Sequence, residues 1–164
     1  MGTARVMRVP PELAEVIAGC TRREVTSGYS GARVFRLTRP GHPALYLKQA
    51  HRVAEATLFR ERERIRWLAG RLPVPEVRGY TVDETGEYLL LTGLPGRDAS
   101  DRRWQSNMPR LVRRLADALR QVHPVPTLDC PFDHTLQRML AAAEDRLRRG
   151  LVDETDFGPI CGGR

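Results

Sequence analysis

The sequence predicts an α+β fold in which an antiparallel sheet with one long helix precedes a purely helical part. Three observations support this prediction. Several short β-prone runs occur within the first 92 residues, one stretch among them has helical periodicity, and only helical patterns follow residue 97. We therefore expect a first lobe over 1–92, a Gly/Pro-containing hinge over 93–97 and a helical part over 98–164. At 164 residues, 41% apolar and 29% charged, the chain is long enough to bury a core.

The first elements along the chain are a short helix and three strands. The segment 10–19 begins with proline and ends with glycine, which is typical of helix termini. Three β-prone runs follow, separated by the loop Gly28-Tyr29-Ser30-Gly31 and by a Pro/Gly breaker over 39–43, and they predict an antiparallel meander. These runs cover residues 22–27, 32–38 and 44–49.

A long helix and a hairpin complete the first lobe. Apolar residues recur at helical spacing within 53–72, and Pro-Val-Pro over 73–75 ends that helix. A turn over 83–87 joins two further β-prone runs, 77–82 and 88–92, and the second is apolar enough for a buried strand. Beyond the hinge, helices are expected over 109–122 and 135–149.

Two features of the predicted strands could carry chemistry. The loop Gly28-Tyr29-Ser30-Gly31 could cradle a phosphate with its backbone N–H groups, or it could be a simple hairpin turn. Lys48 is the only lysine among 27 basic residues, in an apolar strand. From there it either reaches solvent at a sheet edge or points into a cleft at an anion. Tyr46, two residues earlier, shares its face of the strand.

The third candidate, Glu61, lies on the apolar face of the long helix between Leu58 and Ile65. A carboxylate in an apolar stripe either sits at the margin of the stripe or is paired, because an unpaired buried charge is costly. The preceding strand offers Lys48 as the obvious cation. We therefore predict a Lys48–Glu61 ion pair.

A glycine loop, a strand lysine, a helix glutamate, an apolar strand and a hinge, in that order, are the parts of a kinase nucleotide lobe. The stretches over 26–37, 45–48 and 61–77 closely resemble aminoglycoside 3'-phosphotransferases, the bacterial antibiotic kinases of protein-kinase-like fold. Leu-Arg-Gln-Val-His-Pro over 119–124 and Asp-Cys-Pro-Phe over 129–132 extend this resemblance, which covers the chain to about residue 153. It implies a protein-kinase-like nucleotide lobe followed by the first helices of a helical lobe.

The resemblance implies an ATP site and assigns residues to its phosphate end. Ser30, Gly31 and neighbouring backbone amides would cover the β-phosphate. Lys48 would hold the α- and β-phosphates, and Glu61 would orient Lys48.

At the adenine end, Tyr46 matches the aromatic residue on which the family stacks adenine. The backbone of Thr92 and Leu94 would bind the adenine edge. For the intact family, the resemblance implies transfer of the ATP γ-phosphoryl group to a hydroxyl of an aminoglycoside, with magnesium, as a mechanism of antibiotic resistance.

The sequence departs from the family where its catalytic machinery is expected. Family members continue into His-Gly-Asp-x-x-x-x-Asn, which supplies the base and a magnesium ligand, and into a second metal-binding aspartate. The triplet Asp156-Phe157-Gly158 spells a kinase magnesium motif, but without that upstream loop we interpret it as a coincidence. We expect a truncated ATP-binding chain with no catalytic residue and no magnesium ligand, and whether it is an enzyme stays open. None of the four histidines precedes Gly-Asp: they are His42, His51, His123 and His134.

Two other interpretations stay open. A net charge of +7 suits a non-catalytic basic protein that contacts nucleic acid through its arginines. Against it, the arginines over 60–66 alternate with glutamates and no nucleic-acid motif occurs, so no specific nucleic-acid partner is expected. A complete small ATP-binding regulator would keep the same site residues and differ in its partners.

The remaining expectations concern location and association. No apolar run approaches the roughly 18 residues of a membrane span, no signal peptide is evident, and we expect a cytoplasmic protein without a membrane partner. Several apolar residues of the helices after the hinge would lack part of their partners in a truncated chain, which favours self-association through these helices. They are Leu111, Leu115, Leu119, Met139, Leu140 and Leu147.

Overall fold

A computed structural model describes residues 9–26, 32–51 and 57–151. The chain divides into two compact units, 1–125 and 126–164. The first contains the sheet, and the second contains helix α4 (Leu136–Arg148). The other helical elements are α1 (Pro11–Ala14), α2 (Thr57–Leu68), the 3-10 helix η1 (Arg102–Asn107) and α3 (Met108–Val122).

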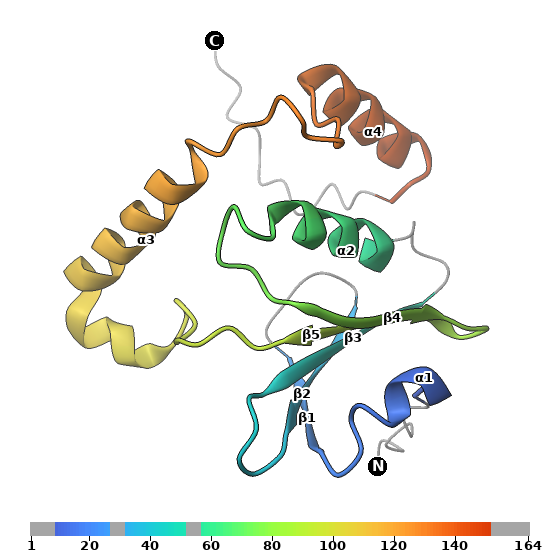
Figure 1. Cartoon of the computed structure of the whole chain (residues 1–164). Helices are drawn as coiled ribbons and strands as arrows, with labels where there is room; N and C mark the ends of the chain where they lie inside the picture. Colours follow the sequence, from blue (N-terminus) through green and yellow to red (C-terminus); the bar gives the residue numbers. More distant parts are fainter. Residues whose placement is uncertain (1–8, 27–31, 52–56, 152–164) are drawn as a thin grey trace. The chain divides into compact units, whose positions relative to one another are not determined.

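One five-stranded sheet forms the centre of the first unit, in the order β1-β2-β3-β5-β4 with every neighbouring pair antiparallel (Figure 1). The first three strands form the predicted meander, and the predicted hairpin joins it through β5. The predicted α+β class, an antiparallel sheet with one long helix, is confirmed. The strands are β1 (Thr21–Val25), β2 (Arg33–Thr38), β3 (Leu45–His51), β4 (Val77–Val82) and β5 (Gly86–Thr92).

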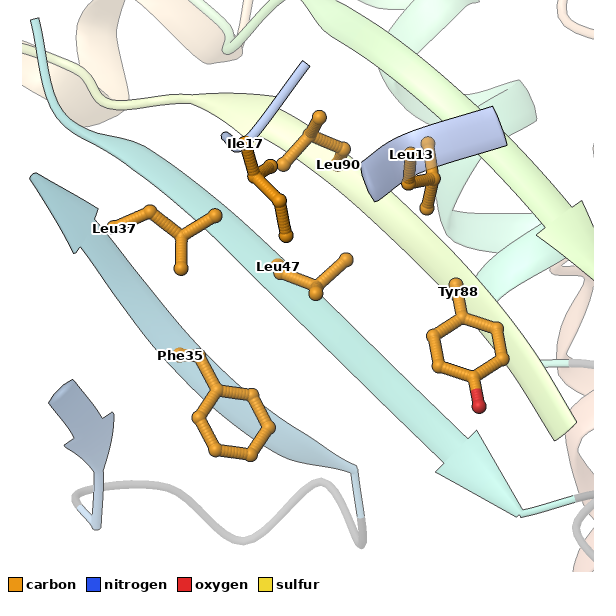
Figure 2. Close-up of a cluster of buried hydrophobic side chains, with 7 residues drawn as sticks. All are labelled: Leu13, Ile17, Phe35, Leu37, Leu47, Tyr88 and Leu90. Carbon is orange, nitrogen blue, oxygen red and sulfur yellow. The ribbon is translucent and has the colours of Figure 1, made fainter. Parts of the chain in front are cut away.

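The main core lies between one face of the sheet and the α1 segment. Leu47 in the centre of β3 is fully buried, and Leu13 of α1 and Ile17 of the following turn cover it. Figure 2 shows these side chains converging over the strands. This face is apolar, so its burial stabilises the sheet. The other members of the cluster are Phe35, Leu37, Tyr88 and Leu90.

The opposite face of the sheet is covered by α2, which lies against β3, β4 and β5 (Figure 1). Leu58 of α2 packs in a second cluster with Leu89 and Leu91 of β5 and Ala50 of β3. Because side chains alternate along a strand, Tyr46, Lys48 and Ala50 all point to this face. The α2 face is therefore the one that carries the candidate residues of β3.

Several predicted boundaries need correction. The helix predicted over 10–19 is regular only in α1, and the rest of that segment forms turns. The long helix ends at Leu68 rather than at Leu72, because Gly70 adopts a positive φ of 79° and the N–H groups of Arg71 and Leu72 both donate to the Leu68 carbonyl. The second strand of the hairpin begins at Gly86, two residues earlier than predicted.

Glycine is required at Gly86 because of its surroundings. Its φ is 154°, and a Cβ atom there would collide with the Ala50 carbonyl of the neighbouring strand. Glycine thus permits the close approach of the two backbones where β5 begins to pair with the end of β3, at the pair Gly86 and His51.

The helices after the hinge differ from the sheet in burial. In α3, Leu111 is buried, contrary to expectation, whereas Leu115 and Leu119 are exposed as predicted. In α4, Met139, Leu140 and Leu147 are exposed. Among the described residues, no helix combines the length and apolarity needed to cross a membrane. The hinge over 93–97 as a lobe boundary stays a prediction.

Candidate functional site

Lys48 lies in the middle of the sheet, on a strand paired on both sides. Its partners across the sheet are Val34 of β2 and Leu89 of β5. The alternative in which Lys48 reaches solvent from a sheet edge is therefore wrong. Lys48 Nζ lies 2.6 Å from Glu61 Oε1, and the predicted ion pair is confirmed.

The pair is accessible from one side. The side chains of Lys48 and Glu61 are 24% and 33% exposed, so neither charge is fully desolvated. An ammonium group has three N–H donors, and Glu61 takes one of them in this geometry. The others can bind an anion such as a phosphate while Glu61 fixes the lysine side chain.

Tyr46 lies beside Gly93, the first residue of the predicted hinge. It lies two residues before Lys48 on β3, on the same face of the sheet, and pairs with Leu91 of β5. The N–H of Gly93 donates to the Ala44 carbonyl at 2.8 Å. A Cβ atom at Gly93 would lie 2.9 Å from that oxygen and 3.1 Å from Tyr46 Cε2, so glycine lets the backbone run directly against the ring.

The N–H and the side chain of Thr92 are both used in hydrogen bonds within the protein. Its N–H donates to the Glu76 carbonyl at 3.0 Å, and its Oγ1 accepts a hydrogen bond from the Glu76 N–H at 2.9 Å. These two bonds tie the end of β5 to the segment before β4. Because the N–H and the side chain are occupied, a main-chain role of Thr92 toward a ligand would use its carbonyl oxygen.

Leu94 differs from Thr92 in its exposure and in the hydrogen bonding of its main chain. It is 53% exposed, and in the part of the chain that the structure describes no group accepts a hydrogen bond from its N–H. Its main chain is thus available for a ligand at the hinge, next to the Tyr46 ring against which Gly93 packs.

Ser30, Gly31 and the triplet Asp156-Phe157-Gly158 lie outside the described residues. The phosphate-covering role of Ser30 and Gly31 stays a prediction. Residues 9–26, 32–51 and 57–151 contain no group of three His, Cys, Asp or Glu side chains that could hold a metal ion. The described part of the site therefore does not fit a magnesium ion.

Removal of the Glu61 carboxylate should destabilise the fold. Glu61→Ala would leave Lys48 without its partner, between Val34 and Leu89, and we expect a loss of about 1–2 kcal/mol in the free energy of unfolding. Urea unfolding of the wild type and the variant measures this loss. The matched control, Asp117→Ala, removes a carboxylate from an exposed pair with Arg120 and should cost no more than about 0.5 kcal/mol. Equal effects of the two substitutions would contradict this prediction.

A cluster between α2 and strands β4 and β5 was not predicted from the sequence. Glu87, Tyr80 and Arg62 gather around Phe59 of that helix. The sequence pattern places Glu87 in the predicted turn over 83–87, although a carboxylate directly before four apolar strand residues is the kind of anomaly that singles out Lys48. The same criterion, applied one residue beyond the predicted strand, would have found it.

Comparison with known proteins agrees with this geometry. Residues 21–158 match the phosphotransferase enzyme family, which is most of the chain. The chain belongs to this family. Among family members, it is similar to the aminoglycoside 3'-phosphotransferase of Niallia circulans, with 36% identity over 150 residues that cover 90% of this chain and 56% of the relative. The resemblance to aminoglycoside 3'-phosphotransferases is thereby confirmed.

Two solved structures of family members share the fold. An aminoglycoside 3'-phosphotransferase of type VIII superposes with a TM-score of 0.75 at 35% identity, over 89% of this chain and 54% of that one. An aminoglycoside phosphotransferase of Streptomyces rimosus, in complex with ADP and streptomycin, superposes with a TM-score of 0.62 at 29% identity, over 85% and 49%. The chain thus spans about half the length of the relatives it matches.

Proposed function

We propose that these 164 residues form the ATP-binding part of an aminoglycoside O-phosphotransferase. The observation that carries the proposal is the Lys48–Glu61 pair at 2.6 Å, on the same sheet face as Tyr46. A fixed ammonium group at one end and an aromatic ring beside a free main-chain donor at the other suit a nucleotide. Phosphates carry negative charge, and a base has both a flat apolar face and hydrogen-bonding edges.

Each residue then has a defined task. Lys48 holds the α- and β-phosphates with the donors that Glu61 leaves free, and Glu61 keeps the lysine in place. Tyr46 stacks on the adenine, whose edge binds the Thr92 carbonyl and the Leu94 N–H. Ser30 and Gly31 cover the β-phosphate.

The names of the similar relatives support a proposal for the acceptor of the phosphoryl group. Because they are named for phosphorylating aminoglycosides, we propose a hydroxyl of an aminoglycoside as acceptor in the whole protein, with antibiotic resistance as the outcome. One similar relative is an aminoglycoside 3'-phosphotransferase and another, from Streptomyces griseus, is a streptomycin 3''-kinase. The proposal therefore names the class of antibiotic and not the individual compound. We also propose that the protein is located in the cytoplasm, where ATP is available.

Titration of the purified chain with ADP, followed by calorimetry, tests the nucleotide site. We expect saturable binding to the wild type and affinity lower by about tenfold or more in Lys48→Ala, because a charged hydrogen bond is lost. Arg120→Ala removes the same charge from an exposed helix position and should bind ADP as the wild type does. Absence of binding at millimolar ADP, or equal affinity of the wild type and Lys48→Ala, would overturn the proposal.

The nucleic-acid interpretation predicts a different result in the same preparation. Many arginines of the described residues are paired with carboxylates, including Arg33 with Glu24 and Arg103 with Asp101, which lowers the positive charge available to phosphates. We therefore expect weak binding of duplex DNA and RNA. Tight binding with a steep dependence on salt, together with no ADP binding, would favour the basic binding protein instead.

A further inference from the structure

Glu87 is a buried carboxylate that the proposed site does not use. It is 9% exposed and lies on β5, opposite Ala50 of β3 and Val82 of β4. Its position in the alternation places it with Leu89 and Leu91, on the face that α2 covers. A charged group in this place needs a partner, because burial of an unpaired carboxylate is unfavourable.

The first partner is the backbone of α2. Glu87 Oε2 accepts a hydrogen bond from the N–H of Phe59 at 2.8 Å. Phe59 is in the first turn of the helix, where N–H groups have no acceptor within the helix. The first turn of α2 contains no acidic residue of its own, so Glu87 supplies from another strand both the acceptor and the negative charge that a helix N-terminus favours.

The nearby side chain on β4 is Tyr80, which lies across from Leu89. Burial raises the pKa of the Tyr80 phenol, and the negative charge of the nearby Glu87 carboxylate raises this pKa further. The phenol therefore stays protonated beside the carboxylate. Glu87 is thus hydrogen-bonded to the helix, and its charge lies close to Tyr80 of the neighbouring strand.

Arg62 extends this attachment along the helix. Its guanidinium carbon lies 4.3 Å from the centroid of the Tyr80 ring and 4.6 Å from that of Phe59, and the two rings meet edge to face at 6.1 Å. Residues 59 and 62 of α2 are therefore both held to the β4–β5 hairpin. Glu61 lies between them in the chain.

We propose that Glu87 is a positioning residue, which sets the height and rotation of α2 at which Glu61 reaches Lys48. The apolar contacts of Leu58 hold the helix on the sheet, but they are non-directional and permit it to slide or turn. A hydrogen bond weakens steeply with distance and angle, so the bond from the Phe59 N–H to Glu87 restricts both movements. A helix displacement of about 1 Å would already take the 2.6 Å Lys48–Glu61 contact beyond good hydrogen-bond length.

The single lysine offers a direct test. Labelling the chain with isotopic lysine gives one side-chain NMR signal, that of Lys48, whose position reports whether the pair is formed. Glu61→Gln provides the reference signal of a broken charge pair. We expect Glu87→Ala to move the Lys48 signal most of the way to this reference. Glu87→Gln, whose amide oxygen can still accept from Phe59, should stay closer to the wild type.

A neighbouring residue provides the matched control. Tyr88 is next to Glu87 on β5, but its hydroxyl lies on the α1 side of the sheet, where it accepts a hydrogen bond from Gln49 Nε2 at 3.1 Å. Tyr88→Phe removes a buried polar contact without touching α2, and should lower stability while leaving the Lys48 signal unchanged. A wild-type Lys48 signal in folded Glu87→Ala overturns the inference. If that variant does not fold, the same result in Glu87→Asp, which withdraws the acceptor by one methylene, overturns it.

The consequence for ligand binding rests on the proposed function. In the wild-type background, Glu87→Ala should weaken ADP binding by about threefold or more, and in the Glu61→Gln background it should have no further effect. Additive losses would mean that Glu87 acts by some other route and would overturn the inference. Absence of ADP binding to the wild type would refute the proposed function alone, because the Lys48 signal still decides whether Glu87 positions Glu61.

Discussion

The 164-residue chain, purified and mixed with ATP, magnesium and a kanamycin-type aminoglycoside, is expected to form no phosphorylated antibiotic. The reason lies in its residue content. The loop His-Gly-Asp-x-x-x-x-Asn, which the family resemblance implies for the base and a metal ligand, does not occur in the sequence. Its single asparagine, Asn107, is already used as a helix cap, because its Oδ1 accepts a hydrogen bond from the N–H of Arg110.

The expected loss is complete because of how phosphoryl transfer is catalysed. Positioning of the two substrates and neutralisation of the developing charge supply most of the acceleration, so a site without its base and metal ligands retains little of it. The charge of the chain adds to the effect. An aminoglycoside is a polycation, and a net charge of +7 repels it rather than concentrating it near the nucleotide.

Mass spectrometry of the antibiotic after long incubation at high protein concentration measures this result. The nucleotide titration in the same preparation shows whether the ATP site is intact, so that absence of transfer can be separated from a misfolded sample. Phosphorylated product made by the wild type and not by Lys48→Ala would contradict the prediction, since contamination by another kinase would not depend on Lys48.

The parts of the fold that were predictable from the sequence are those with strong local patterns. The apolar run of β5 and the helical periodicity around Ile65 identified a buried strand and a long helix. Periodicity alone placed the end of that helix wrongly, because Leu72 continues the apolar spacing. The positive φ of Gly70 ended the helix at Leu68, and a pattern of apolar residues contains no information about that turn.

The candidate site also has a part that was predictable from the sequence and a part that was not. Lys48 and Glu61 were predictable as a pair because each is a charged residue in an apolar pattern, so each required a partner. The contacts of Glu87 with Phe59 and of Gly93 with Tyr46 were not, because they join residues 28 and 47 positions apart through backbone groups. Such contacts depend on how the strands are ordered in the sheet, which local sequence does not specify.

Amide hydrogens of α3 are expected to exchange at least about 100-fold faster than those of β5 in the monomeric chain. Residues 88–90 of β5 are fully buried on both faces of the sheet. In α3, by contrast, Leu111 is the buried side chain, and the apolar stripe is 48–58% exposed. The members of this stripe are Met108, Val112, Leu115, Leu119 and Val122.

The physical reason is that α3 gains little from packing. A 15-residue helix is marginal in water on its own, and most helical stability in proteins comes from burial of an apolar face. Local unfolding of α3 therefore exposes little additional apolar surface. Opening of β5 disrupts both core clusters and requires global unfolding. A difference of about 2.7 kcal/mol between the two openings gives the 100-fold ratio.

Hydrogen exchange measured by mass spectrometry, at concentrations where light scattering shows a monomer, tests this expectation. The apolar stripe also leads us to propose self-association through α3, in which case its protection rises with concentration as the dimer appears. Leu115→Glu should then abolish both the dimer and the added protection, while β5 exchanges as before. Protection of α3 equal to that of β5 in a demonstrated monomer would contradict the prediction, and would mean that the helices after the hinge close a core of their own.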